Sequence, residues 1–216
     1  FGHADRSLMI LLNYMSREFQ NFAILPFDRL NILDVRERVN AMYKRMNNVI
    51  VREYYDIALK AYRDAAIEAS SDDEDFDPYE FVSVMLKAYD PLSDFVYTRE
   101  YTRKRDRMFE SVIAAELGNQ EMRRNLKRGL DVLANQVRQY ADNITVRARI
   151  TAFRHAGIRY VRWVTENDEK VCKTCKPRDG VIYLIGEIQS MIPAHWNCRC
   201  IIYPATEEEY LAQQAA

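Results

Sequence analysis

The chain has 216 residues, of which 48% are hydrophobic, and its 31 Lys and Arg nearly balance 32 Asp and Glu for a formal net charge of −1. Its longest apolar runs fall far short of the roughly 18 residues of a membrane span, so the composition indicates a soluble globular protein. A chain of this length buries a core without cross-links, so its four cysteines are not needed to hold the whole protein together.

The N-terminal part of the sequence predicts long amphipathic helices. From Asp5 to Gln20, apolar residues recur at spacings of three and four. After Pro26, a longer periodic segment runs from about Leu30 to Ala69 without an internal Gly or Pro. We expect one or two long helices there, with an apolar stripe that needs a partner.

Residues 70–77 are polar and acidic and predict a loop that ends in a helix start signal. Asp77 is placed as the N-cap, Pro78 at the first helical position and Glu80 three residues after the cap. This pattern predicts a short helix to about Tyr89, closed by Asp90 and Pro91.

Further helical patterns cover residues 97–117, 121–141 and 145–156. Gly118 ends the first of these segments, and Gly157 is well placed as the C-terminal cap of the last.

Beyond Gly157 the sequence becomes rich in β-branched and aromatic residues. Segments 158–165, 181–185 and 200–203 predict strands. The sequence therefore predicts a mainly α protein with a small α+β C-terminal module: an elongated body of long helices over residues 1–144, and a compact β-rich domain over residues 145–216.

Charge divides the chain differently, because residues 1–98 carry a net −6, residues 99–162 a net +8 and residues 163–216 a net −3. Clusters of Lys and Arg bind phosphates without any base-reading motif, so the basic middle predicts non-specific contact with a polyanion such as DNA. An acidic protein partner, or the acidic flanks of the chain itself, would serve equally. The clustered residues on predicted helices are Arg103, Lys104, Arg105, Arg123, Arg124, Lys127 and Arg128.

All four cysteines lie between residues 172 and 200. Cys172 and Cys175 have the C-x-x-C spacing that lets two thiolates on one tight turn reach the same metal ion. His195, Cys198 and Cys200 follow, which gives five candidate ligands for a tetrahedral site that needs four. We expect one structural zinc ion, bound within this set.

The spacing leaves the choice of four ligands open. His195 and Cys198 repeat the two-residue gap of the first pair, but Cys200 would point to the same side of a strand as Cys198 and could replace either neighbour. Two disulfides are the alternative, although they leave His195 unexplained. A redox C-x-x-C is less favoured, because Pro177 and an Asp-Gly turn follow it instead of a helix.

The C-terminal third contains two motifs that occur together. One is W-V-T-E-N-D-E-K-V-C-K-T-C-K-P-R-D-G-V from Trp163 to Val181, and the other is P-A-H-W-N-C-R-C-I-I-Y-P from Pro193 to Pro204. In combination they resemble the C-terminal signature of the phage Mu F-like minor head proteins. The resemblance covers about residues 145–204, whereas residues 1–144 match only in being long, charged and helical.

This resemblance implies a structural component of a tailed-phage or prophage virion, made in the bacterial cytoplasm. Such proteins lie in the head interior or at the portal vertex, contact the portal and other head proteins, and take part in head morphogenesis and sometimes in DNA packaging or delivery. The resemblance implies no catalytic residues. A bacterial cytosol also favours zinc over disulfides.

Two other functions fit parts of the sequence. One is a nucleic-acid-binding zinc module, and the other is a zinc-supported nuclease with His195 as base and Asp168 or Asp179 on a second metal. A catalytic zinc site needs an open coordination position, and the surplus of thiols argues against one. We expect Trp163 and Trp196 in the core of the module, and Arg199 as a structural hydrogen-bond donor or a partner contact.

Overall fold

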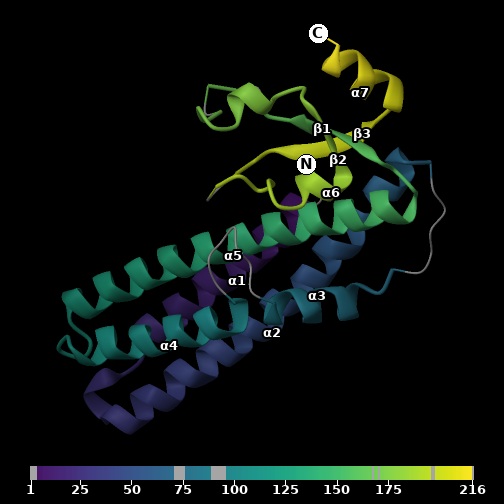
Figure 1. The fold of residues 1–216 in the computed structure, drawn as a ribbon. Coiled ribbons are helices and arrows are strands. Elements are labelled where there is room, and N and C mark those ends of the chain that lie inside the picture. The colour runs from purple at the N-terminus through teal and green to yellow at the C-terminus, as the bar shows by residue number, and fades with distance from the viewer. Residues whose placement is uncertain are drawn as a thin grey trace.

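The computed structural model describes residues 4–70, 76–88, 96–166, 168–169, 171–195 and 198–215. The helical part is elongated, with the C-terminal module at one end of it (Figure 1). A short 3₁₀ turn, Phe27–Arg29, lies between the first two helices. The five helices of the body are α1 (Ala4–Ala23), α2 (Ile32–Glu68), α3 (Pro78–Lys87), α4 (Tyr97–Ile113) and α5 (Gln120–His155).

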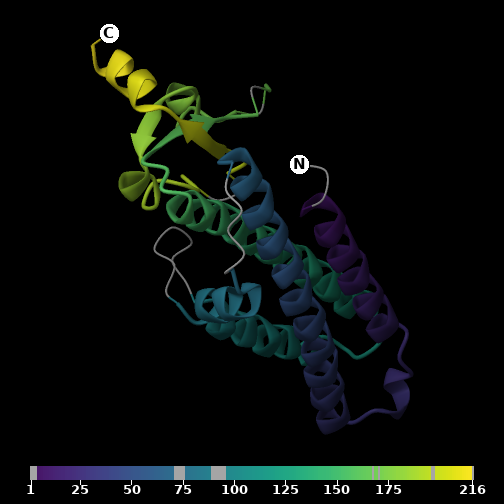
Figure 2. The ribbon, with the colours of Figure 1, turned by 90° about the vertical axis from the view of Figure 1, so that its right-hand side faces the viewer.

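The C-terminal module is built on a three-stranded antiparallel sheet in the order β2-β1-β3. Its strands are β1 (Tyr160–Val164), β2 (Ile182–Leu184) and β3 (Ile201–Ala205), and its short helices are α6 (Ile185–Ile188) and α7 (Glu207–Gln214). Seen from the side, α7 and the sheet lie beyond the ends of α2 and α5 (Figure 2). The predicted fold class, mainly α with a small α+β module, is confirmed.

The core of the body forms around α2, which contacts α1, α3, α4 and α5. Because buried tyrosines still need a partner for their hydroxyl groups, they donate to backbone carbonyls, Tyr54 to Val137 at 2.9 Å and Tyr101 to Tyr43 at 2.7 Å. Large side chains that are fully buried in this core include Leu11, Met15, Tyr43, Met46, Ile50, Tyr54, Tyr97 and Tyr140.

The last long helix differs from the prediction. The sequence predicted separate helices over 121–141 and 145–156, and the structure has one continuous helix, α5. Residues 142–144 contain no Gly or Pro to break it, and Ile144 continues the buried apolar stripe. The polar residues inside this stretch do not interrupt it, because the buried Gln139 donates to the Asn143 amide oxygen one turn later.

Predicted helix caps are confirmed at two positions. The Asp77 side chain accepts hydrogen bonds from the backbone of Tyr79 and Glu80, with Pro78 at the first helical position. Gly157 ends α5 with φ +71°, and the amide of Ile158 donates to the Phe153 carbonyl at 2.8 Å, which is the Schellman arrangement. Residues 71–75 of the loop predicted over 70–77, and the Asp90-Pro91 stop, lie outside the described residues.

A second core joins the module to the body. It contains the buried Trp163, Val161 and Ile202 of the sheet and also residues from the C-terminal ends of α2 and α5, including Tyr62 and Phe153. The module therefore does not bury its interior alone, and the ends of the two longest helices form its floor.

Arg149 connects the helical body to the module at this second core. Its side chain is only 4% exposed, forms an ion pair with Glu68 of α2 and donates from Nη2 to the Ile202 carbonyl of β3 at 2.8 Å. One guanidinium from α5 thus bonds α2 and the sheet, and the sequence did not predict this contact. In the part of the chain that the structure describes, no helix has the length and apolar character to cross a membrane.

Candidate metal centre

The first arm of the candidate site is a tight turn between β1 and β2. The amides of Cys175 and Lys176 donate to the Cys172 carbonyl at 3.2 and 3.0 Å, and the Cys175 amide also lies 3.3 Å from the Cys172 sulfur. A 3₁₀ turn, Lys176–Arg178, follows. This folding points both thiols of the C-x-x-C motif to the same side, as a metal-binding turn requires.

The Asp-Gly turn of the motif holds that arm against β1. Gly180 has φ +77°, and the Val181 amide donates to the Arg178 carbonyl at 3.0 Å. The Gly180 amide donates to the Trp163 carbonyl at 2.8 Å, and Asp179 Oδ1 accepts from the Thr165 amide at 2.7 Å. The Trp, Thr, Asp and Gly of the motif are therefore one connected structural unit.

The second arm enters β3. The Cys198 amide donates to the His195 carbonyl at 3.2 Å, so these two residues also form a turn, and Cys200 directly precedes the strand. The strand pairs with β1, with Trp163 opposite Ile202. Sheet pairing thus brings the second arm beside the first, although at least 20 residues separate them.

The five predicted ligand residues converge in two groups that share Cys175. Ligand atoms of Cys172, Cys175 and His195 lie within 4.8 Å of one another, and so do those of Cys175, Cys198 and Cys200. His195 Nε2 lies 3.0 Å from the Cys172 sulfur and 3.1 Å from the Cys175 sulfur, and the Cys175 and Cys198 sulfurs are 3.9 Å apart. Ligand atoms about 2.3 Å from a tetrahedral zinc lie roughly 3.8 Å apart, so the Cys175 to Cys198 spacing matches one edge of such a site.

A small cavity of about 30 Å³ lies within the cluster. Four of the five candidates line it, Cys172, Cys175, His195 and Cys200, together with Thr165 and Glu166. The cavity thus favours Cys200 as the fourth ligand, whereas the sulfur spacing favours Cys198. Cys175 is central by both criteria.

The pKa values of the four thiols are shifted in opposite directions. A hydrogen bond with Cys200 lowers the pKa of Cys198 to about 5, and the Cys175 amide lowers the pKa of Cys172 to about 7. Burial raises the pKa of Cys175 to about 12, and the hydrogen bond with Cys198 raises the pKa of Cys200. Each group therefore contains thiols that oppose simultaneous ionisation, and a bound cation would stabilise them all as thiolates.

Side chains around the cluster support it. Arg199 forms a two-point ion pair with Asp168 at 2.7 and 2.8 Å, so the predicted structural donor role is observed. The buried Trp163 indole N–H has no hydrogen-bond acceptor in range among the described residues, yet it lies close enough to Cys200 to lower the pKa of that thiol. Trp163 is fully buried, as predicted, and Trp196 lies outside the described residues.

The donor set fits a soft, tetrahedral metal ion. All four cysteines are free thiols, so no disulfide competes for them. Thiolates with one imidazole suit zinc, whereas magnesium and calcium take oxygen ligands. The orphaned indole N–H fits as well, because a metal-bound thiolate is a good hydrogen-bond acceptor. The carboxylates that a nuclease reading would use are already engaged, Asp168 with Arg199 and Asp179 with Thr165.

Sequence reasoning missed two features of this region. Thr165 and Glu166 line the cavity without belonging to any metal-ligand spacing. Helix α7 was also not predicted, although Thr206 and Glu209 form a capping box whose S/T-x-x-E signal is readable in the sequence.

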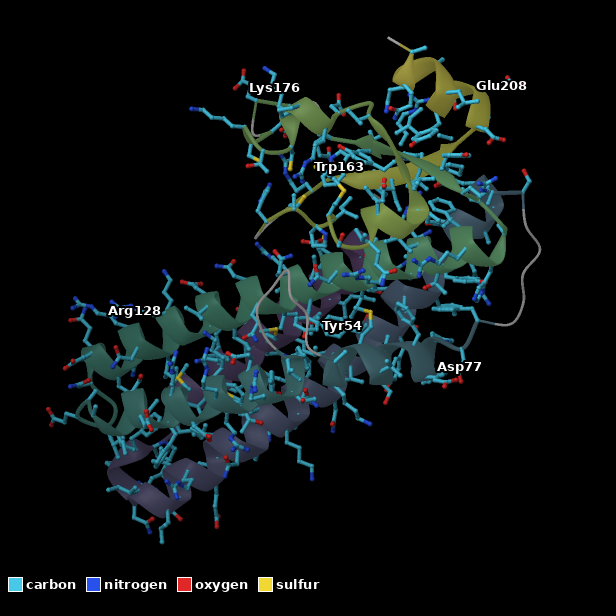
Figure 3. The ribbon with its side chains drawn as sticks, viewed as in Figure 1. Tyr54, Asp77, Arg128, Trp163, Lys176 and Glu208 are labelled. Atoms are coloured by element: carbon cyan, nitrogen blue, oxygen red, sulfur yellow. The ribbon has the colours of Figure 1, made fainter. Side chains whose placement is uncertain are left out.

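The predicted DNA-contacting residues lie away from the cluster, on α4 and the start of α5. Figure 3 shows Arg128 far along the helical body from Trp163. Arg103 is paired with Glu100 and Arg105 with Asp106. The exposed members are Arg103, Arg123, Arg124, Lys127 and Arg128, while Lys104 and Arg105 are partly buried.

Comparison with known proteins relates part of the chain to a known family. No curated protein and no solved structure matches the chain. The family described as Phage Mu protein F like protein matches residues 107–203, which run from α4 through the whole cysteine and histidine cluster into β3. The match thus begins earlier than the resemblance over residues 145–204 that the motifs indicated. It confirms that this chain is similar to the Phage Mu F-like proteins over the long helix α5 and the C-terminal module as far as the first residues of β3.

Proposed function

We propose that this protein is a structural, non-enzymatic component of a tailed-phage or prophage head, with a C-terminal module that one zinc ion holds together. The observation that carries the proposal is the thiol-rich cluster inside the region that matches the Phage Mu F-like family. The cluster joins two chain segments and packs on the ends of α2 and α5, which is the position of a structural staple.

The chemistry of the cluster supports a structural role over a catalytic one. A catalytic zinc keeps a coordination position open and has an acid or base beside it. Here four of the five donors line a cavity of about 30 Å³, and the neighbouring Asp168 is held by Arg199. Cys172 and Cys175 from the first arm, with His195 and one of Cys198 and Cys200 from the second, would hold the ion. Bound zinc would supply folding free energy on the order of 10 kcal/mol.

The proposed partners are the portal and other head proteins, and the proposed location is the head interior or the portal vertex after synthesis in the bacterial cytoplasm. The helical body is elongated (Figure 1), and its helices carry exposed residues that such contacts could use. Contact with packaged DNA through the basic residues of α4 and α5 is part of this proposal, because they lie on α4 and the start of α5 and several are exposed.

Co-purification with the portal protein of the same phage tests the proposed role. The full chain, co-expressed with that protein, should elute with the portal ring before and after nuclease treatment. Cys175→Ser should weaken the complex if the zinc module forms part of the contact surface. Loss of co-elution on nuclease treatment, or no co-elution at all, would contradict the portal contact.

Single substitutions test which residues hold the ion. Cys198→Ser and Cys200→Ser should differ, because only one of the two completes a four-ligand set with Cys172, Cys175 and His195. The ligand variant should lower the zinc content measured by elemental analysis, and the other should retain about one ion per chain. Equal retention in all five single variants would contradict a zinc site built from this set.

A further inference from the structure

A basic groove lies between α4 and α5, outside the metal centre. It has a volume of about 270 Å³, and α4 contributes Lys104, Arg107 and Ser111 to its walls, while α5 contributes Asn125 and Arg128. On each helix the lining residues are three, four or seven positions apart, so they form one helix face. The two faces meet because Asn125 donates to the Ser111 carbonyl at 3.0 Å.

The three cations of this groove are not neutralised within the described residues. Ion pairs are observed for the neighbouring Arg103 and Arg105, with Glu100 and Asp106, and none is observed for Lys104, Arg107 or Arg128 in the described part of the chain. Burial and repulsion from Arg103 and Arg107 lower the pKa of Lys104. Like charges held this close raise the free energy of the site, and a bound anion would lower it.

Met108 of α4 and Gly129 of α5 also line the groove, between its basic residues. Gly129 of α5 faces Met108 of α4, and a Cβ added at Gly129 would lie 1.7 Å from the Met108 methyl carbon. A side chain at position 129 would therefore displace the Met108 side chain from the space between α4 and α5. Close packing brings the charged residues of both helices to the rim of one groove.

We propose that this groove is a phosphate-binding site and that its ligand is a phosphodiester group of a nucleic-acid backbone, held by Lys104, Arg107 and Arg128. Two guanidinium groups match a phosphate because each presents paired N–H donors to its oxygens. The Asn125 and Ser111 side chains add polar groups beside them. Arg107 lines this groove, whereas Arg123 and Lys127 do not, so these two residues contribute to DNA binding only through long-range charge.

The choice of duplex DNA as ligand rests on the proposed location in a phage head, but the groove itself does not depend on the zinc ion or on portal binding. The phosphate-binding groove and the proposed zinc-stapled, portal-binding role can therefore be tested independently. Loss of portal co-purification would leave DNA binding unchanged, and loss of specific groove binding would leave the zinc content unchanged.

A pair of charge-matched double variants tests the groove. Arg107→Gln with Arg128→Gln removes two charges from the groove, and Arg123→Gln with Lys127→Gln removes two from elsewhere on α5. Binding of a fluorescent duplex DNA to the full chain is measured over a range of salt concentrations. The groove variant should bind about tenfold more weakly and lose about two from the slope of log affinity against log salt, while the control changes less than about threefold.

Further measurements separate misfolding and other ligands from the proposal. Arg107→Lys with Arg128→Lys should keep the salt slope, and thermal unfolding should match the wild type in all variants because these side chains are exposed or lie at a rim. Inorganic phosphate should compete with DNA more strongly than chloride at equal ionic strength. The proposal would be overturned if both Gln double variants bound DNA equally weakly, or if the wild type did not bind DNA. It would also be overturned if the groove variant bound DNA like the wild type but no longer bound an acidic protein partner.

Discussion

The helical body and the C-terminal module bury their interiors by different means. The body surrounds α2 with four other helices and fills its core with large aromatic and aliphatic side chains. The module has three short strands, and its core needs the ends of α2 and α5 to close it. A small domain buries too little apolar surface to be stable alone, so the body should fold through packing and the module through the body and a metal ion.

Removal of the metal should produce the largest difference between the two regions. Cys175→Ser removes the thiol that both ligand groups share, and chelation of the wild type should act in the same way. We expect hydrogen exchange to become fast over residues 157–205 while α1, α2 and α4 remain protected, because zinc supplies on the order of 10 kcal/mol to such modules.

The neighbouring exposed residue provides the control for this experiment. Lys173→Ser changes a residue of the same turn that offers no ligand. It should leave the protection pattern unchanged. Uniform loss of protection across the body in Cys175→Ser would show that the two regions fold as one unit.

Loss of the Arg149 contact should have the second-largest effect. Arg149→Ala leaves Glu68 without its partner and the Ile202 carbonyl without a side-chain donor, at a cost of about 3–5 kcal/mol. Chemical denaturation should then show the module unfolding before the body. Arg154→Ala, which removes an exposed arginine of the same helix, should change neither transition. A single shared unfolding transition in Arg149→Ala would contradict the role of Arg149 in joining the module to the body.

A buried hydrogen bond within the body should matter less. Tyr54→Phe removes the donor to the Val137 carbonyl and should lower the free energy of unfolding by about 1 kcal/mol, with zinc content unaffected. Tyr79→Phe, on a residue that is 64% exposed, should be neutral. Equal losses for both variants, measured by urea titration, would mean that the Tyr54 contact does not support the body core.

The smallest effect should come from the ion pair beside the metal centre. Both side chains of the Arg199 and Asp168 pair are about two-fifths exposed, and such pairs contribute less than about 1 kcal/mol. Asp168→Asn should therefore retain zinc and lower the thermal midpoint only slightly, as Glu169→Gln should. Loss of zinc in Asp168→Asn would show that the carboxylate acts directly on the ligands.

These two regions also differ in how far their sequences predict them. Regular spacing of apolar residues predicted α1 and α2, because periodicity follows directly from which face is buried, and β-branched and aromatic residues predicted the module strands. The break predicted after residue 141 was wrong, because residues 142–144 contain no Gly or Pro and the buried Ile144 continues the apolar stripe of one helix.

The metal-ligand spacing named five residues, and the structure brings all five together. The choice among them depends on a cavity and on sulfur distances that spacing does not encode. The contacts of Arg149 could not be predicted from the sequence either, since its partners Glu68 and Ile202 lie far away along the chain.

Zinc content with a thiol count tests the central claim most directly. The protein is purified without added metal, zinc is measured by elemental analysis, and free thiols are counted in denaturant before and after chelation. We predict about one zinc per chain, with all four thiols reactive once the chain is unfolded and the metal removed. No zinc and no free thiols would show disulfides instead, and would contradict the metal-stapled module.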